Sequence, residues 1–260
     1  MELPREIERI TKGMPCAENR TGMSDARVLI YPELVLKILP DRPEVQREMR
    51  MLRWLEGKVP APRVAACEKS GDSVFLLMTR VPGRMACDAA LLRDPDRLTD
   101  RLAEAMRLLW ETNISDCPVI RDQQAELAEA RLRVEKGRVN KENAEPSTFG
   151  PGGFRDPAAL LCWLENNRPS PDPVLSHGDF CLPNVLFTDG GLGGFIDLGD
   201  SGVGDRWRDI ALCHRSLRHN TDGTYGTVIP GFDADRLFSA LGVRRDPDKL
   251  RWYLLLDELF

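Results

Sequence analysis

The segment 174–200, VLSHGDFCLPNVLFTDGGLGGFIDLGD, limits the possible folds of this chain more than any other segment. Two apolar runs on either side of a Thr-Asp-Gly-Gly turn predict a β-hairpin over 185–196. Asn184 precedes this hairpin and Asp197 follows it. Because a hairpin returns the chain to its starting end, we expect the amide of Asn184 and the carboxylate of Asp197 to lie close together there.

Three polar residues of this segment have a regular spacing. His177, Asp179 and Asn184 fit H-x-D-x-x-x-x-N, the spacing of a kinase catalytic loop. Phosphoryl transfer depends on positioning and on neutralisation of charge, and Asp179 suits the group that orients or accepts the proton of the acceptor hydroxyl. Asn184 and Asp197 supply the oxygen atoms that Mg²⁺ prefers beside nucleotide phosphates. The alternative is a polar turn and a strand-end carboxylate, but type, spacing and hairpin together favour a phosphoryl-transfer site.

Composition narrows the choice of partners and compartment. The 260 residues suffice for one large domain or two lobes, and 42% hydrophobic and 30% charged residues are typical of a soluble protein. A net charge of −5 argues against nucleic acid as a partner and permits a cationic substrate. No apolar run approaches the ~20 residues of a membrane span, and the start lacks a signal-peptide core. Seven cysteines without a C-x-x-C pair indicate reduced thiols in a cytoplasmic protein.

The remaining pattern changes from β-rich to mainly helical near residue 80. Strands are expected at 27–31, 34–39, 64–67 and 74–78, and helices at 3–12, 43–56, 95–111, 123–134, 157–166, 205–217, 233–241 and 246–260. We therefore predict an α+β, two-lobed, protein-kinase-like fold. Its small β-rich N-lobe would span 1–79, its hinge 80–84, and its larger helical C-lobe 85–260.

The expected N-lobe contains candidate nucleotide-binding residues. Lys37 lies inside the second strand, and Glu48 lies on the helix that follows it. In kinases such a lysine binds nucleotide phosphates and such a glutamate orients it. The alternative is a solvent-facing lysine and a solvated helix carboxylate. Adenine would lie against the backbone of the hinge, at Arg80 and Val81.

Several longer motifs point to one family. The segments LSHGDFCLPNVLF, GFIDLGDSGVGDRWRDIALCHRSLR and YLLLDELF closely resemble the aminoglycoside 3′-phosphotransferases, the kanamycin-kinase group. MLRWLEGKVPAPRV and NRTGMSDARV resemble the small lobe of the same family, so the resemblance runs from about residue 18 to the C-terminus. It implies ATP-dependent phosphorylation of a hydroxyl, at the 3′ position, of aminoglycosides such as kanamycin, which confers resistance.

The resemblance also implies roles for individual residues. It makes Asp179 the catalytic base, Asn184 and Asp197 the Mg²⁺ ligands, and Lys37 and Glu48 the phosphate-binding pair. Two further sets follow from the same comparison: a loop over the phosphates at Met23 and Ser24, and drug contacts at Glu142, Glu145, Asp257, Glu258 and the terminal carboxylate of Phe260. Carboxylates suit a substrate with several ammonium groups. The alternatives are an exposed acidic loop and a frayed helix end.

Two residues depart from the family pattern. Asp200 stands where many members have arginine, and Val35 stands where some have an aromatic residue that stacks on adenine, so GTP is not excluded. A kinase of another small alcohol, such as a macrolide, choline or a sugar, and a catalytically inactive binding module are the alternative functions. We expect a monomer or a weak dimer.

Overall fold

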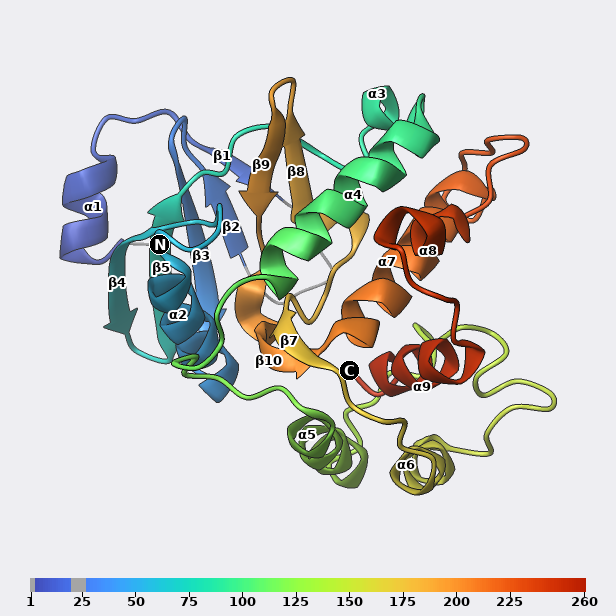
Figure 1. Cartoon of the computed structure of the whole chain (residues 1–260). Helices are drawn as coiled ribbons and strands as arrows, with labels where there is room; N and C mark the ends of the chain where they lie inside the picture. The colour runs from blue at the N-terminus through green and yellow to red at the C-terminus, as the bar shows by residue number, and fades with distance from the viewer. Residues whose placement is uncertain (1–2, 20–26) are drawn as a thin grey trace. The chain divides into compact units, whose positions relative to one another are not determined.

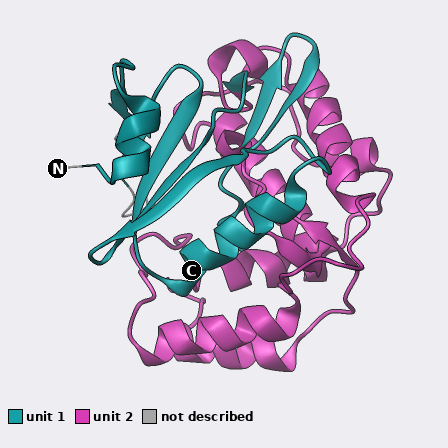
Figure 2. Ribbon diagram, turned by 90° about the vertical axis from the view of Figure 1, so that its left-hand side faces the viewer, with its two compact units in different colours: residues 1–84, 185–200 teal, residues 85–184, 201–260 magenta. Residues whose placement is uncertain are grey.

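The computed structural model describes residues 3–19 and 27–260. The chain forms two compact units, Met1–Arg84 with Val185–Asp200 and Met85–Asn184 with Ser201–Phe260 (Figure 2). The first unit is built on an antiparallel sheet and the second is mainly helical, which confirms the predicted fold class. The predicted division at 80–84 lies at the first change of unit, and the hairpin segment 185–200 belongs with the first unit.

The first unit contains a five-stranded antiparallel sheet. Its strand order is β1 (Ala17–Asn19), β2 (Arg27–Ile30), β3 (Leu34–Pro40), β5 (Ser73–Thr79) and β4 (Val64–Ser70). Two helices accompany the sheet, α1 (Arg5–Thr11) and α2 (Pro43–Leu55) (Figure 1). Pro43 begins α2, where its missing N–H costs no helical hydrogen bond.

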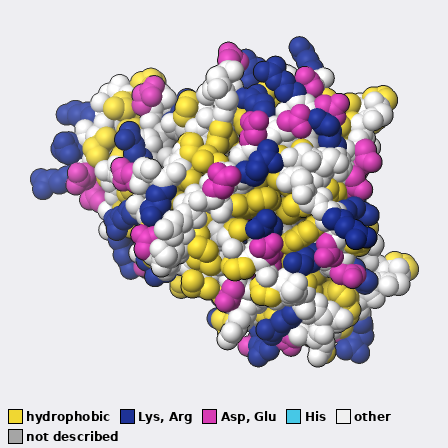
Figure 3. All heavy atoms as spheres, viewed as in Figure 1, with side chains coloured by type: hydrophobic (Ala, Val, Ile, Leu, Met, Phe, Trp, Pro, Cys, Tyr) yellow, Lys and Arg dark blue, Asp and Glu magenta, His cyan; other side chains and the backbone are white. Residues whose placement is uncertain are grey.

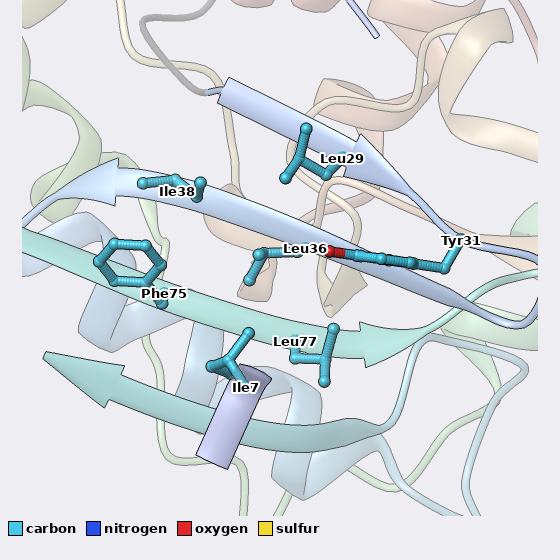
Figure 4. Close-up of a cluster of buried hydrophobic side chains, with 7 residues drawn as sticks. All are labelled: Ile7, Leu29, Tyr31, Leu36, Ile38, Phe75 and Leu77. Carbon is cyan, nitrogen blue, oxygen red and sulfur yellow. The ribbon is translucent and has the colours of Figure 1, made fainter. Parts of the chain in front are cut away.

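The two faces of β3 have different surroundings because strand side chains alternate. On one face Leu36 lies opposite Leu77 and is fully buried. Figure 4 shows the apolar cluster on this face, to which α1 contributes one residue: Ile7, Leu29, Tyr31, Leu36, Ile38, Phe75 and Leu77. Lys37 therefore points to the other face, where it meets a side chain of α2. This alternation is what separates the core of the unit from its polar site.

The predicted hairpin is present as β8 (Val185–Thr188) and β9 (Gly191–Phe195). It forms a three-stranded sheet with β6 (Arg84–Met85) in the order β6-β8-β9. A Cβ on Gly193 would lie 2.1 Å from the carbonyl oxygen of Pro82, and one on Gly194 would lie 2.7 Å from that of Pro60. Because any side chain would collide there, the glycines let β9 pack directly on the backbone of the first unit.

The second unit is built from helices and one short antiparallel strand pair. Its elements are α3 (Ala89–Leu92), α4 (Pro95–Trp110), α5 (Gln123–Glu135), α6 (Pro157–Asn166), α7 (Arg206–Thr221), α8 (Arg236–Leu241), α9 (Pro247–Asp257), β7 (Pro173–Ser176) and β10 (Gly202–Asp205). Helix α7 packs against α9, α4 against α8, and α5 against α6 (Figure 1). Asp side chains cap α4, α5, α6, α7 and α9 by accepting hydrogen bonds from first-turn N–H groups.

Short elements account for most differences from the predicted pattern. Strands β1, β7 and β10 and helix α3 have three or four residues each, and none was predicted. Helix α7 continues to Thr221, beyond the expected end at 217, because Ser216, His219 and Asn220 are buried in the unit. Propensity alone places its end too early.

The surface and the thiols are those of an ordinary globular chain. On the face seen in Figure 3, acidic and basic side chains are interspersed. All seven cysteines lie among the described residues and are free thiols. No helix in residues 3–19 and 27–260 has the length and apolar character needed to cross a membrane.

Candidate active site

Lys37 is the centre of a charged network in the first unit. Its Nζ lies 2.7 Å from Oε1 of Glu48 on α2 and 2.9 Å from Oδ1 of Asp197, which follows β9. The side chains of Lys37 and Glu48 are mostly buried, whereas that of Asp197 is 60% exposed. The structure therefore brings together three predicted site residues from three separate elements.

The charge of Lys37 is maintained by its two neighbours. Burial opposes the charged form, but the attraction and hydrogen bonds of Glu48 and Asp197 outweigh it and raise the pKa of the Lys37 ammonium above its ordinary value. The amine is therefore protonated throughout the physiological pH range. It can act as a fixed positive charge for an anionic ligand.

The backbone at Asp197 is unusual. Its φ is +61°, and it is the one non-glycine residue with positive φ among the residues that the structure describes. Aspartate is among the few residue types that adopt this region with modest strain. After it, Leu198 is buried and begins a single 3₁₀ turn, Leu198–Asp200.

Asp200, which stands where many members of the family have arginine, is bound by a residue of α2. Arg47 of α2 donates from Nε to the carbonyl oxygen of Gly199 at 2.8 Å, and from Nη2 to Oδ1 of Asp200 at 3.0 Å. An arginine at position 200 would instead bring two cations together. The negative charge of Asp200 is thus matched within the first unit.

Arg80 and Val81, the hinge residues predicted to lie against adenine, line a cavity of about 480 Å³. Arg80 and Val81 form part of its wall, together with Glu33, Leu34, Pro60, Ala61, Arg63, Thr79, Pro82 and Gly193. Lys37 and Val35 do not belong to this lining. The cavity by itself therefore does not account for a nucleotide site. Met23 and Ser24, the predicted loop over the phosphates, lie outside the described residues.

In the second unit, Asp179 and Asn184 are hydrogen-bonded to each other. Nδ2 of Asn184 donates to Oδ2 of Asp179 at 2.7 Å and to the carbonyl oxygen of the same residue at 3.0 Å. The 3₁₀ turn Leu182–Asn184 between β7 and β8 makes this approach possible. The bond fixes the rotation of the Asp179 carboxylate. It also identifies Nδ2 as the donor, so Oδ1 is the acceptor atom of the Asn184 amide.

A buried carboxylate holds the loop that precedes Asp179. Asp209 of α7 is fully buried and accepts hydrogen bonds from Oγ of Ser176 at 2.9 Å, the N–H of His177 at 3.1 Å and the N–H of Gly178 at 3.1 Å. Burial raises the pKa of Asp209, and the positive field of His177 and these hydrogen bonds oppose the shift. Losing such a bonded anion would leave several buried donors without acceptors.

Arg208 supports the same loop from the adjacent position. Its Nε donates to the carbonyl oxygen of Gly178 at 2.6 Å, and its Nη1 pairs with the buried Glu126 of α5. Glu126 in turn lies 2.6 Å from Nε of Arg121. The loop before Asp179 is therefore fixed by hydrogen bonds from both its N–H and its carbonyl side.

Three predicted drug contacts form one cluster in the second unit. The N–H of Glu145 donates to Oε2 of Glu258 at 3.0 Å, and Arg215 of α7 pairs with Asp257 and lies 3.7 Å from Glu258. Oε1 of Glu145 lies 3.1 Å from Nε2 of His219. Glu142 is on the same loop as Glu145 and is exposed. The acidic groups of this mixed cluster thus have cationic or hydrogen-bonding neighbours.

Burial is the main influence on the charge of Glu258. It raises the pKa of this carboxyl to about 7; the N–H of Glu145 and Arg215 lower it, and the anionic Asp257 and Glu145 raise it. The pKa of His219 is lowered by burial, which the nearby Glu145 partly offsets. Glu258 can therefore change protonation near neutral pH, whereas the lowered pKa of His219 favours its neutral imidazole.

Phe260 is held by arginines on two helices. Arg133 of α5 donates from Nε to the carbonyl oxygen of Leu259 at 2.8 Å and from Nη2 to an oxygen of Phe260. The guanidinium groups of Arg133 and Arg208 lie 5.5 and 5.7 Å from the centre of the Phe260 ring, within the range of cation–π interaction. The segment after α9 is therefore packed on the same arginine that supports the loop before Asp179.

The sequence analysis did not single out several side chains of these networks: Arg47, Arg121, Glu126, Arg133, Ser176, Arg208, Asp209, Arg215 and His219. Charged residues on helices are usually solvated, so the sequence contained no sign that the arginines bind backbone or carboxylates. Asp209 had a weak signal. It lies in a helix whose neighbours Ile210, Ala211 and Leu212 are apolar and buried, so solvent exposure was not assured.

Comparison with known proteins agrees with this architecture. The family model described as "phosphotransferase enzyme family" matches residues 16–253. An aminoglycoside 3′-phosphotransferase from Enterococcus faecalis is 34% identical over an alignment of 272 positions, which covers 100% of this chain and 99% of the relative. One from Streptomyces fradiae is 36% identical over 88% of this chain and 86% of the relative. The crystal structure of an aminoglycoside 3′-phosphotransferase of type VIII has a TM-score of 0.81, 28% identity and 98% coverage of both chains.

These matches extend over the length of both units. The chain therefore belongs to the phosphotransferase enzyme family and, within it, to the aminoglycoside 3′-phosphotransferase family.

Proposed function

We propose that this enzyme transfers the γ-phosphoryl group of ATP to the 3′-hydroxyl of an aminoglycoside antibiotic and thereby confers resistance. The observation that carries the proposal is the bonding of the Lys37 ammonium to both Glu48 and Asp197, at 2.7 and 2.9 Å. A lysine fixed by a helix glutamate beside a metal-binding aspartate is how kinases bind nucleotide phosphates. The names of the full-length relatives support an aminoglycoside as the acceptor.

Asp179 acts on the acceptor. Its carboxylate, oriented by the amide of Asn184, positions the drug hydroxyl and takes its proton while the phosphoryl group leaves the nucleotide. The loop before Asp179 is fixed by Asp209 and Arg208, so the carboxylate keeps its position without reorganisation. The role of Asp179 as base is supported by its place in the H-x-D-x-x-x-x-N spacing.

The donor set suits magnesium. No group of three or more His, Cys, Asp or Glu side chains forms a metal cage within residues 3–19 and 27–260. Mg²⁺ is commonly held by one or two protein oxygens together with phosphates and water, so a complete cage is not needed. Asn184 through Oδ1 and the exposed carboxylate of Asp197 would hold it. When bound, the ion neutralises the charge that develops on the phosphates.

The mixed cluster of the second unit suits a polycation. Glu142, Glu145, Asp257 and Glu258 offer carboxylates to ammonium groups, and an oxygen of Phe260 lies at the end of the same segment. The guanidinium of Arg215 already lies beside these carboxylates. An arriving drug therefore competes with this protein cation, which favours ligands that carry several ammonium groups over singly charged amines.

The remaining features are consistent with this assignment. The backbone at Arg80 and Val81 would bind adenine, and Met23 and Ser24 would cover the phosphates. Val35 provides no aromatic ring, so GTP remains an alternative donor. The reaction uses a cytoplasmic nucleotide, and free thiols fit that compartment. We propose a monomer or a weak dimer.

Release of ADP from Mg·ATP in the presence of kanamycin tests the proposal. Parallel reactions contain a macrolide, choline or a simple sugar, and NMR of the purified product identifies the phosphorylated hydroxyl. We expect turnover with kanamycin and modification at the 3′ position. If only another alcohol were phosphorylated, that alcohol would replace the aminoglycoside as the proposed acceptor. If no acceptor led to ADP release, a catalytically inactive binding module would be favoured.

A further inference from the structure

Residues 197–200 are attached to α2 at two neighbouring positions of the helix. Glu48 reaches Asp197 through Lys37, with distances of 2.7 and 2.9 Å. Arg47, the preceding residue, binds Gly199 and Asp200 directly at 2.8 and 3.0 Å. All six residues belong to the first unit. The two attachments bracket the backbone of Asp197 and the buried Leu198.

Asp197 needs such support. Its left-handed backbone is sparsely populated by residues other than glycine, and its side chain is 60% exposed, so packing holds it only weakly. The Lys37 attachment restrains the carboxylate itself. An incoming cation would compete with Lys37 for that carboxylate, and the attachment would then weaken. The Arg47 attachment does not involve the Asp197 carboxylate and stays intact.

We propose that Arg47 and Asp200 are a positioning pair that keeps Asp197 in its left-handed conformation for binding the metal–nucleotide complex. This inference rests on the proposed function for its consequence in metal binding. Both residues of the pair act through Asp197, because Arg47 binds the backbone and the side chain that follow it. The pair also gives Asp200 a definite task at the position where the sequence departs from the family pattern.

The geometry requires arginine on the helix side. The guanidinium donates from Nε to a carbonyl oxygen and from Nη2 to a carboxylate, and its planar fork holds both acceptors at once. A lysine carries one donor centre and would keep the charge while losing the second contact. Arg47→Lys should therefore lie between the parent and Arg47→Gln.

Nucleotide binding with and without metal provides the first test. Calorimetry on Asp200→Asn should show a roughly three- to tenfold weaker affinity for a non-hydrolysable ATP analogue with Mg²⁺, the range for one partly exposed charged pair. Affinity for the same analogue in EDTA should remain unchanged. Arg47→Gln should behave alike, and the double variant should lose no more than either single variant, because both remove one interaction. Additive losses, or equal losses in EDTA, would overturn the proposal.

Hydrogen–deuterium exchange provides a second test that needs no substrate. In Asp200→Asn the backbone amides of 198–200 should exchange several-fold faster, while those of β3 and the apolar cluster stay as in the parent. The matched control is Asp41→Asn, which removes the ion pair of Asp41 with Lys69 elsewhere in the first unit. If exchange at 198–200 were unchanged in a correctly folded variant, Arg47 and Asp200 would not be a positioning pair. If the parent bound no nucleotide, the proposed function would fail, but the exchange experiment would still test whether Arg47 and Asp200 hold the backbone of 197–200.

Discussion

Two networks of the molecule position a functional carboxylate in different ways. One surrounds Lys37 and holds Asp197; the other supports the loop that precedes Asp179. In the first unit the carboxylate of Asp197 is exposed and is held by one cationic side chain, that of Lys37 on β3. In the second unit the loop at 176–178 is held by the buried carboxylate of Asp209, which accepts two of its three hydrogen bonds from backbone N–H groups. Exposed ion pairs contribute about 0–1 kcal/mol, whereas leaving a buried donor unsatisfied costs about 1–3 kcal/mol.

This difference suits the two tasks. A side chain that binds a metal ion must be able to exchange one cation for another, and an exposed ion pair allows that exchange at little cost in free energy. A group that orients a hydroxyl must keep its position, and a buried network of satisfied hydrogen bonds provides that rigidity. We therefore expect changes near Asp197 to alter nucleotide and metal use, and changes near Asp179 to alter turnover and stability.

Removing the carboxylate of Asp179 should have the largest effect. Asp179→Asn should lower kcat by about 10²- to 10⁴-fold, the usual contribution of a general base. The support by Asp209 and Arg208 is untouched, so the melting temperature and nucleotide affinity should stay near those of the parent. Steady-state kinetics and thermal unfolding check this. A variant that retains more than about a tenth of the parent kcat would mean that another group is the base.

Breaking the buried support should affect both turnover and stability. Asp209→Asn replaces an anion that accepts three hydrogen bonds by an amide that also donates, so the free energy of unfolding should fall by roughly 1–3 kcal/mol. Displacement of the loop should lower kcat by about 10²-fold. Denaturant unfolding and kinetics measure the two effects. Ser176→Ala, which removes one donor, is the matched control and should cost less; an equal cost would argue against a shared network.

Loss of the Lys37 charge should act on the nucleotide rather than on the fold. Lys37→Ala should raise the KM for ATP or lower kcat by more than about tenfold, and Glu48→Gln should do so more mildly, because the lysine retains Asp197. The KM for aminoglycoside should change little. If both variants had unchanged nucleotide kinetics, Lys37 and Glu48 would have no role in nucleotide binding.

The smallest effect concerns pH. Because the pKa of Glu258 is raised to about 7, its ionised fraction grows from about one tenth at pH 6 to about nine tenths at pH 8. The KM for aminoglycoside should therefore fall by a few-fold over pH 6–7.5, and Glu258→Gln should flatten this slope. Glu142→Gln, an exposed residue of the neighbouring loop, should retain it.

The same shift has a consequence for stability. The folded state of the parent binds this proton more tightly than the unfolded state, so the contribution of Glu258 to the free energy of unfolding should fall as pH rises from 4.5 to 7. Glu258→Gln should lack this decrease. A parent-like slope in the variant would contradict the assignment of the shift to Glu258.

The sequence predicted the long elements and failed on contacts between distant ones. Helix α2, the β3 strand and the β8–β9 hairpin each have a strong local pattern, and so their positions were expected. Strand β10 (GVGD) has no β-branched run and was not predicted; only its last residue, Asp205, was assigned to the following helix. The pairings of Arg47 with Asp200, Arg133 with Phe260 and Arg215 with Asp257 join residues 42 to 153 positions apart. Nothing local in a charged helix residue marks which partner it will meet.

The discontinuous first unit has a consequence for how the chain is made. Its sheet is encoded in residues 17–79, but the hairpin that packs on the backbone of Pro60 and Pro82 is encoded in 185–195. During synthesis the first unit cannot acquire its second sheet, β6-β8-β9, or Asp197 until the chain has been made as far as residue 197. Until then the backbone that receives β9 is uncovered. A fragment ending at residue 84 should therefore be prone to aggregate, and adding 185–200 in trans should rescue its solubility.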